Sequence, residues 1–142
     1  MADPTRKRVV ITGLGVVTPL GQGIGVFWEN LLAGQCGIDS IGAFDTGGYP
    51  CTIAGEVRDF DPTPAFPSPK EVRRTDRFSQ FGVHAGWQAL NDSGIDLDKA
   101  NRDRVGAFIG SGIGGLITLE NQHKKLLDRG PGRISPFFIP MM

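Results

Sequence analysis

The fold class is decided by the stretch Val105-Gly-Ala-Phe-Ile-Gly-Ser-Gly-Ile-Gly-Gly115. Its first five residues form a short, mainly apolar run, which is typical of a strand buried in a parallel sheet. The glycine-rich turn that follows leads into a predicted helix, with apolar residues at Leu116, Leu119, Leu126 and Leu127 and an end at Gly130-Pro-Gly132. A buried strand, a tight turn and an amphipathic helix together indicate an α/β fold.

The same order of features occurs near the start of the chain. Val9–Thr12 is a second β-branched run, for which we expect another buried strand. A glycine-rich turn again follows, and then a predicted helix that ends at Gly34. The apolar face of this helix consists of Ile24, Phe27, Trp28, Leu31 and Leu32.

Between these two units the sequence predicts an irregular region and two further helices. Residues 35–67 are rich in Gly, Pro and Asp, and we interpret them as an inserted loop region with a short strand at Cys51–Ala54. Ser68-Pro-Lys-Glu71 is a capping box, so a helix should begin at Pro69. Another helix is expected from Phe78 to Asn91, before Ser93-Gly94.

Two strong strands are few for a parallel sheet, and the last residues, Ile134–Met142, are almost all apolar. Terminal segments are usually polar because they lie in water. We therefore expect residues 1–142 to be the incomplete amino-terminal portion of a larger α/β enzyme, with later sequence burying this segment.

Composition argues against several classes of protein. The 15 basic and 15 acidic residues balance, so no global basic excess favours a nucleic acid as partner. No stretch approaches the ~20 apolar residues of a membrane span, and the first eight residues lead into no signal-peptide core. Cys36 and Cys51 have neither disulfide-framework nor zinc spacing. We expect a soluble, cytoplasmic protein.

The turn Gly110-x-Gly112-x-x-Gly115 matches the dinucleotide fingerprint, in which glycines let the backbone approach a pyrophosphate. That fingerprint also needs an acidic residue at the end of a second strand, ~20 residues on. Asp128 has this spacing but falls at a predicted helix end. We favour a tight strand-to-helix turn and keep a nucleotide-binding α/β module as the alternative from another class.

A basic stripe is predicted at Lys70, Arg73, Arg74 and Arg77, which share one helix face at spacings of three and four. The positive end of a helix dipole disfavours cations in the first turns, so an anionic partner would explain the pattern. The alternative is a solvated surface, paired with Glu71 and Asp76.

No convincing catalytic set is present. His84 lies mid-helix among apolar residues and is interpreted as a satisfied packing residue, and His123 as a solvated one. Neither histidine stands in a metal-binding pattern. Cys36 and Cys51 lack the cationic neighbour or helix N-terminus that activates a thiol.

Taken together, several segments resemble the β-ketoacyl-[acyl-carrier-protein] synthases of type II, the elongating condensing enzymes of fatty acid synthesis. In order along the chain, the resembling stretches are Val9–Gly21, Trp28–Gly34, Phe44-Asp45, Ala54-Gly55, Asp59-Phe60, Asp92–Gly94, Ile109–Gly115 and Ile134–Phe138. The resemblance implies a thiolase-like layered α/β fold, a homodimer and no cofactor. It also implies a decarboxylative Claisen condensation between an enzyme-bound acyl thioester and malonyl-carrier protein.

The resemblance also assigns roles to residues of this chain. Carrier-protein binding falls on Lys70, Arg73, Arg74 and Arg133, and the acyl pocket on Ile113 and Phe138. The acyl carrier protein is acidic, so a basic face would steer its docking. The family's nucleophilic Cys, two His and Lys have no counterparts here, so these 142 residues alone should be inactive. The alternatives within this resemblance are a ketosynthase or chain-length subunit of aromatic polyketide assembly and a non-catalytic carrier-binding fragment.

Overall fold

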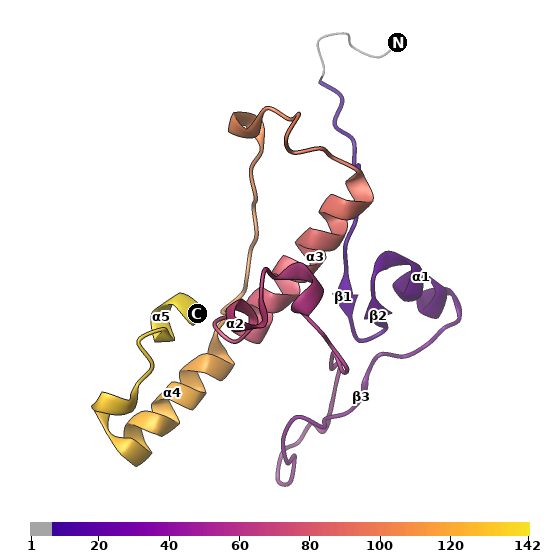
Figure 1. The fold of residues 1–142 in the computed structure, drawn as a ribbon. Helices are drawn as coiled ribbons and strands as arrows, with labels where there is room; N and C mark the ends of the chain where they lie inside the picture. The colour runs from indigo at the N-terminus through magenta and orange to yellow at the C-terminus, as the bar shows by residue number, and fades with distance from the viewer. Residues whose placement is uncertain (1–6) are drawn as a thin grey trace.

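The computed structural model describes residues 7–142 and is organised around α3 (Arg77–Ser93), which lies at the centre of the molecule (Figure 1). The helix begins at the N-cap Asp76 and ends at Gly94, whose left-handed backbone (φ 62°) suits glycine. The helix predicted from Phe78 to Asn91 is therefore confirmed, with one to two more residues at each end. Residues 1–6 lie outside the described residues. They make up most of the eight-residue start that, in the sequence, leads into no signal-peptide core.

Residues 13–16 lie along α3 and are held there by its side chains. The Leu14 amide donates to Asp92 Oδ2 at 2.8 Å, and the Val16 amide donates to Gln88 Oε1 at 2.9 Å. A Cβ atom on Gly15 would lie 2.0 Å from the Ala85 carbonyl oxygen, so only glycine allows this approach. The glycines of this segment thus serve backbone-to-helix packing.

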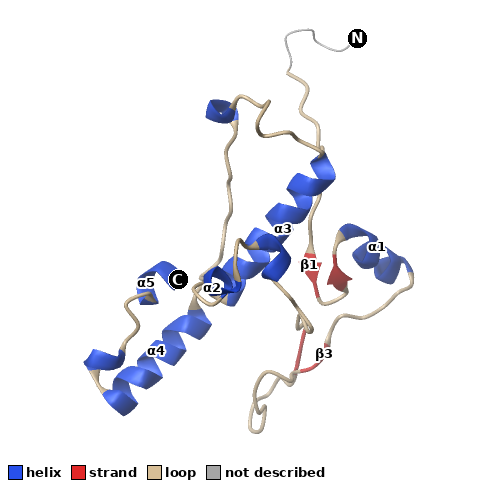
Figure 2. Cartoon of the chain, in the orientation of Figure 1, coloured by secondary structure: helices blue, strands red, loops and turns tan. Residues whose placement is uncertain are grey.

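Four short strands form two antiparallel pairs (Figure 2). β1 (Val17–Thr18) pairs with β2 (Gly21–Gln22), and β3 (Asp39–Ser40) pairs with β4 (Ile53–Ala54). The strand expected at Cys51–Ala54 is thus present only in its second half. The region 35–67 contains β3, β4 and one 3₁₀ turn, η1 (Thr63–Ala65).

The remaining elements are helical. They are α1 (Ile24–Leu32), α2 (Pro69–Val72), η2 (Arg102–Arg104), α4 (Leu116–Arg129), η3 (Pro131–Arg133) and α5 (Phe138–Met141). The predicted helix start at Pro69 is confirmed, as are the helix expected over Ile24–Leu32 and the helix that ends before Gly130. Figure 1 shows α4 leading away from the amino-terminal end of α3, with α5 returning towards α2.

The two buried strands expected from the sequence are not formed within residues 7–142. Val9–Thr12 and Val105–Ile109 carry no strand pairing, and their side chains are largely exposed, with Val9 at 91% and Ile109 at 71%. A strand satisfies its backbone hydrogen bonds only through neighbouring strands. No described segment lies beside either run in that way, so the expected parallel sheet is absent from this part of the chain.

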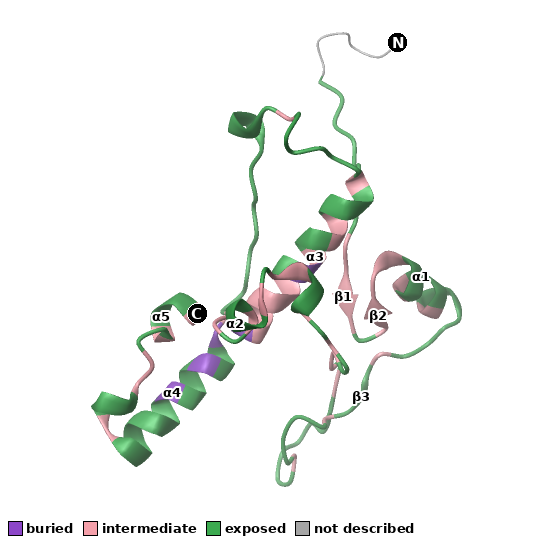
Figure 3. Ribbon diagram, in the orientation of Figure 1, coloured by how far each residue is buried: buried purple, intermediate pink, exposed green. Residues whose placement is uncertain are grey.

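None of the apolar side chains described is buried. Figure 3 shows that exposed and intermediate residues make up nearly all of the ribbon, with buried residues at only a few positions. The accessible surface is 11221 Å², whereas a compact protein of this mass exposes about 7,100 Å². The buried side chains are polar: Asp76, His84, Thr118 and Gln122. Residues 7–142 therefore leave much of their apolar side-chain surface exposed to solvent.

His84 packs as expected, with ring centroids 5.2 Å from Phe60 and 5.5 Å from Trp87. The expectation that its polar atoms are hydrogen-bonded is wrong for one atom, because the buried Nδ1 has no hydrogen-bond partner among the described residues. His123 is exposed, as predicted.

Candidate functional site

Asp76 joins three separate segments near the centre of the molecule. Its Oδ1 accepts from the Phe78 amide at 3.4 Å and so caps α3, while Oδ2 accepts from the Thr118 amide of α4 at 2.8 Å. Its own amide donates to the Met141 carbonyl of α5 at 3.2 Å. The pairing of Asp76 with the basic stripe, considered from the sequence, is therefore wrong, because this carboxylate faces two helix N-termini.

The basic stripe does not lie on one continuous helix. α2 ends at Val72, and a new helix begins at Arg77 because Asp76 caps it. The Arg77 guanidinium donates to the Val57 carbonyl at 2.6 Å and stacks over Phe81 at 5.1 Å. The helix break turns Arg77 inward, so the prediction that it shares the exposed basic face is wrong.

The other three residues of the stripe remain at or near the surface. Lys70 and Arg73 are exposed. Arg74 is half-buried, because its guanidinium carbon lies 4.3 Å from the Phe137 ring centroid and its Nη1 lies 3.7 Å from Glu71 Oε1. One cation of the candidate docking surface is thus held in place, while Lys70 and Arg73 extend into solvent.

Arg133 is placed away from these residues. It lies in η3, beyond the carboxyl end of α4, whereas α2 lies near the amino-terminal end of α4 (Figure 1). A helix of this length spans about 21 Å. Arg133 and Lys70 therefore lie on different elements of the chain, η3 and α2, which flank opposite ends of α4.

The glycine-rich turn before α4 packs against two apolar side chains. Gly114 (φ 74°) and Gly115 (φ 64°) have left-handed backbones, and added Cβ atoms would lie 2.8 Å from the Phe78 ring and 2.9 Å from Met142 Cγ. Ile113, in the same turn, is 79% exposed. Phe138 begins α5 and is half-buried. The turn and α5, the two candidate acyl-pocket segments, meet at Gly115 and Met142.

The amino-terminal end of α4 already holds an anion of the protein. In the dinucleotide fingerprint a pyrophosphate takes the amides at this helix end. Here the buried Asp76 carboxylate accepts from the Thr118 amide. A phosphate placed there would meet a like charge at short range. The geometry favours a packing turn over a nucleotide site.

An apolar cavity of about 410 Å³ lies between α3 and the segment before the turn. Its lining residues are Phe78, Ser79, Gly82, Val83, Ile109, Gly110 and Ser111. The cavity thus places an apolar wall beside the turn that bears Ile113.

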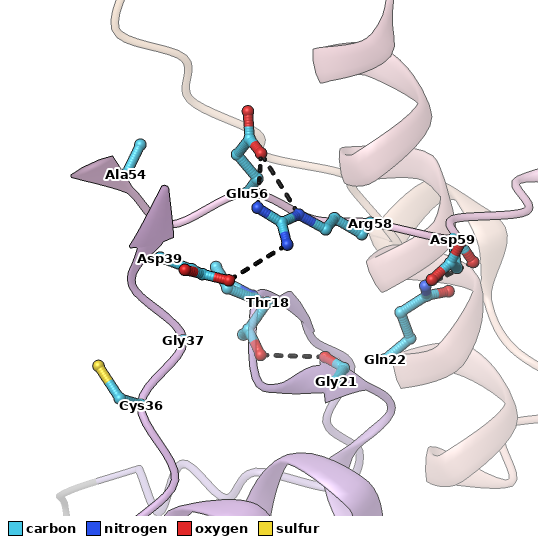
Figure 4. Close-up of a pocket in the computed structure, with 11 residues that line it drawn as sticks. Thr18, Gly21, Gln22, Cys36, Gly37, Asp39, Ala54, Glu56, Arg58 and Asp59 are labelled. Carbon is cyan, nitrogen blue, oxygen red and sulfur yellow. Dashed lines mark hydrogen bonds and ion pairs between the residues drawn. The ribbon is translucent and has the colours of Figure 1, made fainter. Parts of the chain in front are cut away.

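A second, polar pocket of about 270 Å³ lies between the β1–β2 turn and the β3–β4 pair (Figure 4). Arg58 bridges Asp39 at 3.3 Å and Glu56 at 3.2 Å. The amides of Gly42 and Ala43 donate to Glu56 and lower its pKa below the ordinary value, and Arg58 contributes in the same direction. Hydrogen bonding to Glu56 raises the pKa of Arg58. The single guanidinium pairs with both carboxylates and so holds Asp39 and Glu56 together; we call this arrangement the clamp of the inserted region.

Sequence reasoning missed two residues of this site. Asp76 was considered only as a surface partner, although an Asp directly before a helical run is a recognised N-cap signal. Phe137 belongs to the apolar terminus and to the resembling stretch Ile134–Phe138, but no local signal in the sequence pairs it with Arg74. Among residues 7–142, no helix could span a membrane, and no cluster of His, Cys, Asp or Glu has metal-ligand geometry.

Residues 6–142 match the family described as "Beta-ketoacyl synthase, N-terminal domain", and the chain belongs to this family. It is 49% identical, over all of its length, to 3-oxoacyl-[acyl-carrier-protein] synthase 2 of Synechocystis sp.. It is 50% identical, over 95% of its length, to the protein of the same name from Coxiella burnetii. The chain spans about a third of these relatives, 34% and 32% of their lengths.

Solved structures show the same fold. The ishigamide ketosynthase/chain length factor superposes with a TM-score of 0.77 at 29% identity, over 95% of this chain and 34% of that one. A type II polyketide ketosynthase in complex with its acyl carrier protein gives 0.74 at 28%, over 94% and 34%. The expected thiolase-like α/β class is confirmed, and the chain corresponds to part of the amino-terminal portion.

Proposed function

We propose that this chain is the amino-terminal portion of a 3-oxoacyl-[acyl-carrier-protein] synthase that elongates fatty acids. The support is 46–50% identity, along nearly the whole chain, to proteins of that name from three genera. An acyl group would pass from its carrier to a cysteine thiolate, releasing the carrier thiol. Malonyl-carrier protein would then lose carbon dioxide, and the resulting enolate carbon would attack the thioester and expel the cysteine thiolate. The cysteine and the acid–base residues of these steps have no match among the 142 residues.

The part of the function that these residues would supply is substrate delivery. Lys70 and Arg73 are exposed cations, and Arg74 is held against Phe137. An acidic acyl carrier protein approaching this face would be attracted over about 10 Å at moderate salt and oriented by the fixed guanidinium. Arg133 would contribute from a separate position, and Ile113 and Phe138 would line the path of the acyl chain.

A polyketide ketosynthase or chain-length subunit is the second candidate. Two structural neighbours belong to polyketide systems, at 28–29% identity. The 46–50% identity to synthases of fatty acid elongation favours the first candidate. A homodimer in the cytoplasm would fit either.

The test is titration calorimetry, which measures the affinity of an acyl carrier protein for the 142-residue chain at increasing NaCl concentrations. Arg73→Glu should weaken binding about tenfold at low salt, a loss of ~1.4 kcal/mol, and reduce the salt dependence. Arg104→Glu makes the same charge change on exposed η2, away from α2, and should leave affinity unchanged. Absence of binding, or equal loss in both variants, would overturn the docking assignment.

A further inference from the structure

Asp76 has a property that helix capping alone does not require. Capping α3 needs one side-chain oxygen, which serine, threonine or asparagine can supply equally well. In this structure both carboxylate oxygens are used, on the amides of Phe78 and Thr118. The side chain is 5% exposed, the one buried carboxylate of residues 7–142. Two helix N-termini therefore converge on one buried negative charge, which their dipoles favour.

The segments that meet at Asp76 carry all but one of the candidate recognition residues. Arg73 and Arg74 lie three and two residues before it, and Gln80 Nε2 fixes their segment by donating to the carbonyls of Val72 and Thr75 at 3.0 and 3.2 Å. On the α4 side, the turn that contains Ile113 ends at Gly115, three residues before Thr118. On the α5 side, Phe138 lies in the helix that Met141 anchors.

A second link connects the same segments. The Phe137 ring supports the Arg74 guanidinium and lies next to Phe138 in the chain. Gln122 Oε1 accepts from the Ser135 amide at 2.8 Å and fixes this stretch on α4. Arg74, a candidate docking residue, and Phe138, a candidate pocket residue, are thus connected in two ways. One connection runs through Asp76 and the other through Phe137.

We propose that Asp76 is a positioning residue that holds the carrier-docking arginines in register with the acyl-pocket segments, so that docking and acyl-chain contact reinforce each other. This inference rests on the proposed function. It differs from a purely structural role, because loss of folded protein would weaken the binding of every carrier form by the same factor.

The experiment measures the affinity of the 142-residue chain for a carrier protein without an acyl group and for the same carrier loaded with an octanoyl group. The wild-type chain should bind the octanoyl form about tenfold more tightly, the gain from burying about two methylene groups. Asp76→Asn keeps the size of the side chain and one acceptor oxygen, but it leaves one buried amide unpaired. We expect this variant to bind the two carrier forms within about twofold of each other.

Phe137→Leu provides the second variant, because it changes a part-exposed side chain and should fold even if Asp76→Asn does not. It removes the ring beneath Arg74, and we expect the preference for octanoyl carrier to fall about threefold. If the wild-type chain shows the helical circular dichroism that its structure requires and still binds neither carrier, the proposed function fails. If it binds both forms equally, or if the variants that fold retain the full preference, the docking surface stands and the positioning role of Asp76 is overturned.

Discussion

The Arg74 guanidinium carbon lies 4.3 Å from the centre of the Phe137 ring, across 63 positions of sequence. A planar guanidinium can contact the ring face and still donate hydrogen bonds from its edge, which a lysine ammonium does less well. Arg73, the neighbouring cation, is exposed. Substitutions of these two adjacent arginines can therefore distinguish the effect of positive charge on carrier binding from the effect of stacking on Phe137.

Arg74→Lys should weaken carrier binding about threefold although the charge is kept, since an exposed cation–π contact is worth ~0.5–1 kcal/mol. Arg73→Lys should change the affinity by less than about twofold, because it keeps the charge and has no ring beneath it to lose. Titration calorimetry at constant salt makes the comparison. Equal losses in the two variants would show that the Phe137 ring has no part in docking.

Gly15→Ala should lift residues 13–16 from α3, because the new Cβ would lie 2.0 Å from the Ala85 carbonyl oxygen. Exchange of the Leu14 and Val16 amides with deuterium should accelerate about tenfold or more, as local protection is lost. Gly25→Ala is the control, because its Cβ would enter open space within α1 and alanine favours a helix. Unchanged exchange in Gly15→Ala would contradict the packing role given to this glycine.

The clamp around Glu56 should depend on pH. Its pKa is lowered in the folded chain, first by the amides of Gly42 and Ala43 and then by Arg58. A carboxyl of this kind stabilises the fold above its unfolded pKa and loses that contribution as the pH falls through the folded value. Exchange of the Gly42 and Ala43 amides, corrected for intrinsic rates, should therefore rise below the ordinary glutamate value of 4.5. Glu56→Gln should abolish that pH dependence. If amide exchange in this variant still rises at low pH, another group is responsible.

Titration with nicotinamide and adenine dinucleotides should show no micromolar binding. The Thr118 amide, one of those a pyrophosphate would need, already donates to the Asp76 carboxylate. Saturable binding that shifts the amide resonances of residues 110–118 would revive the nucleotide alternative.

Local signals in the sequence predicted most helix boundaries, because a cap acts within a few residues. Ser68 and Gly94 mark helix ends in the sequence and in the structure alike. The expected strands Val9–Thr12 and Val105–Ile109 failed within the described residues, because a strand is completed by neighbours that local pattern cannot supply.

The candidate site was predictable in part for the same reason. Lys70 and Arg73 are on the surface, as their pattern indicated. Arg77 is turned inward and donates to Val57. The prediction for this residue is wrong because it assumes one continuous helix, whereas Asp76 caps a new helix that begins at Arg77. The stacking of Arg74 on Phe137 depends on how distant segments fold together, and no spacing rule contains it.

The exposed apolar surface of residues 7–142 has a consequence for synthesis in the cell. In relatives about three times as long, this third leaves the ribosome first, and the rest follows at ~5–20 residues per second. For roughly tens of seconds in such a relative, side chains at the positions of Phe108 and Ile139, which are exposed in residues 7–142, would face solvent. A nascent chain of this kind is a natural client for chaperones that bind apolar segments, and its yield should depend on how quickly translation delivers the remainder.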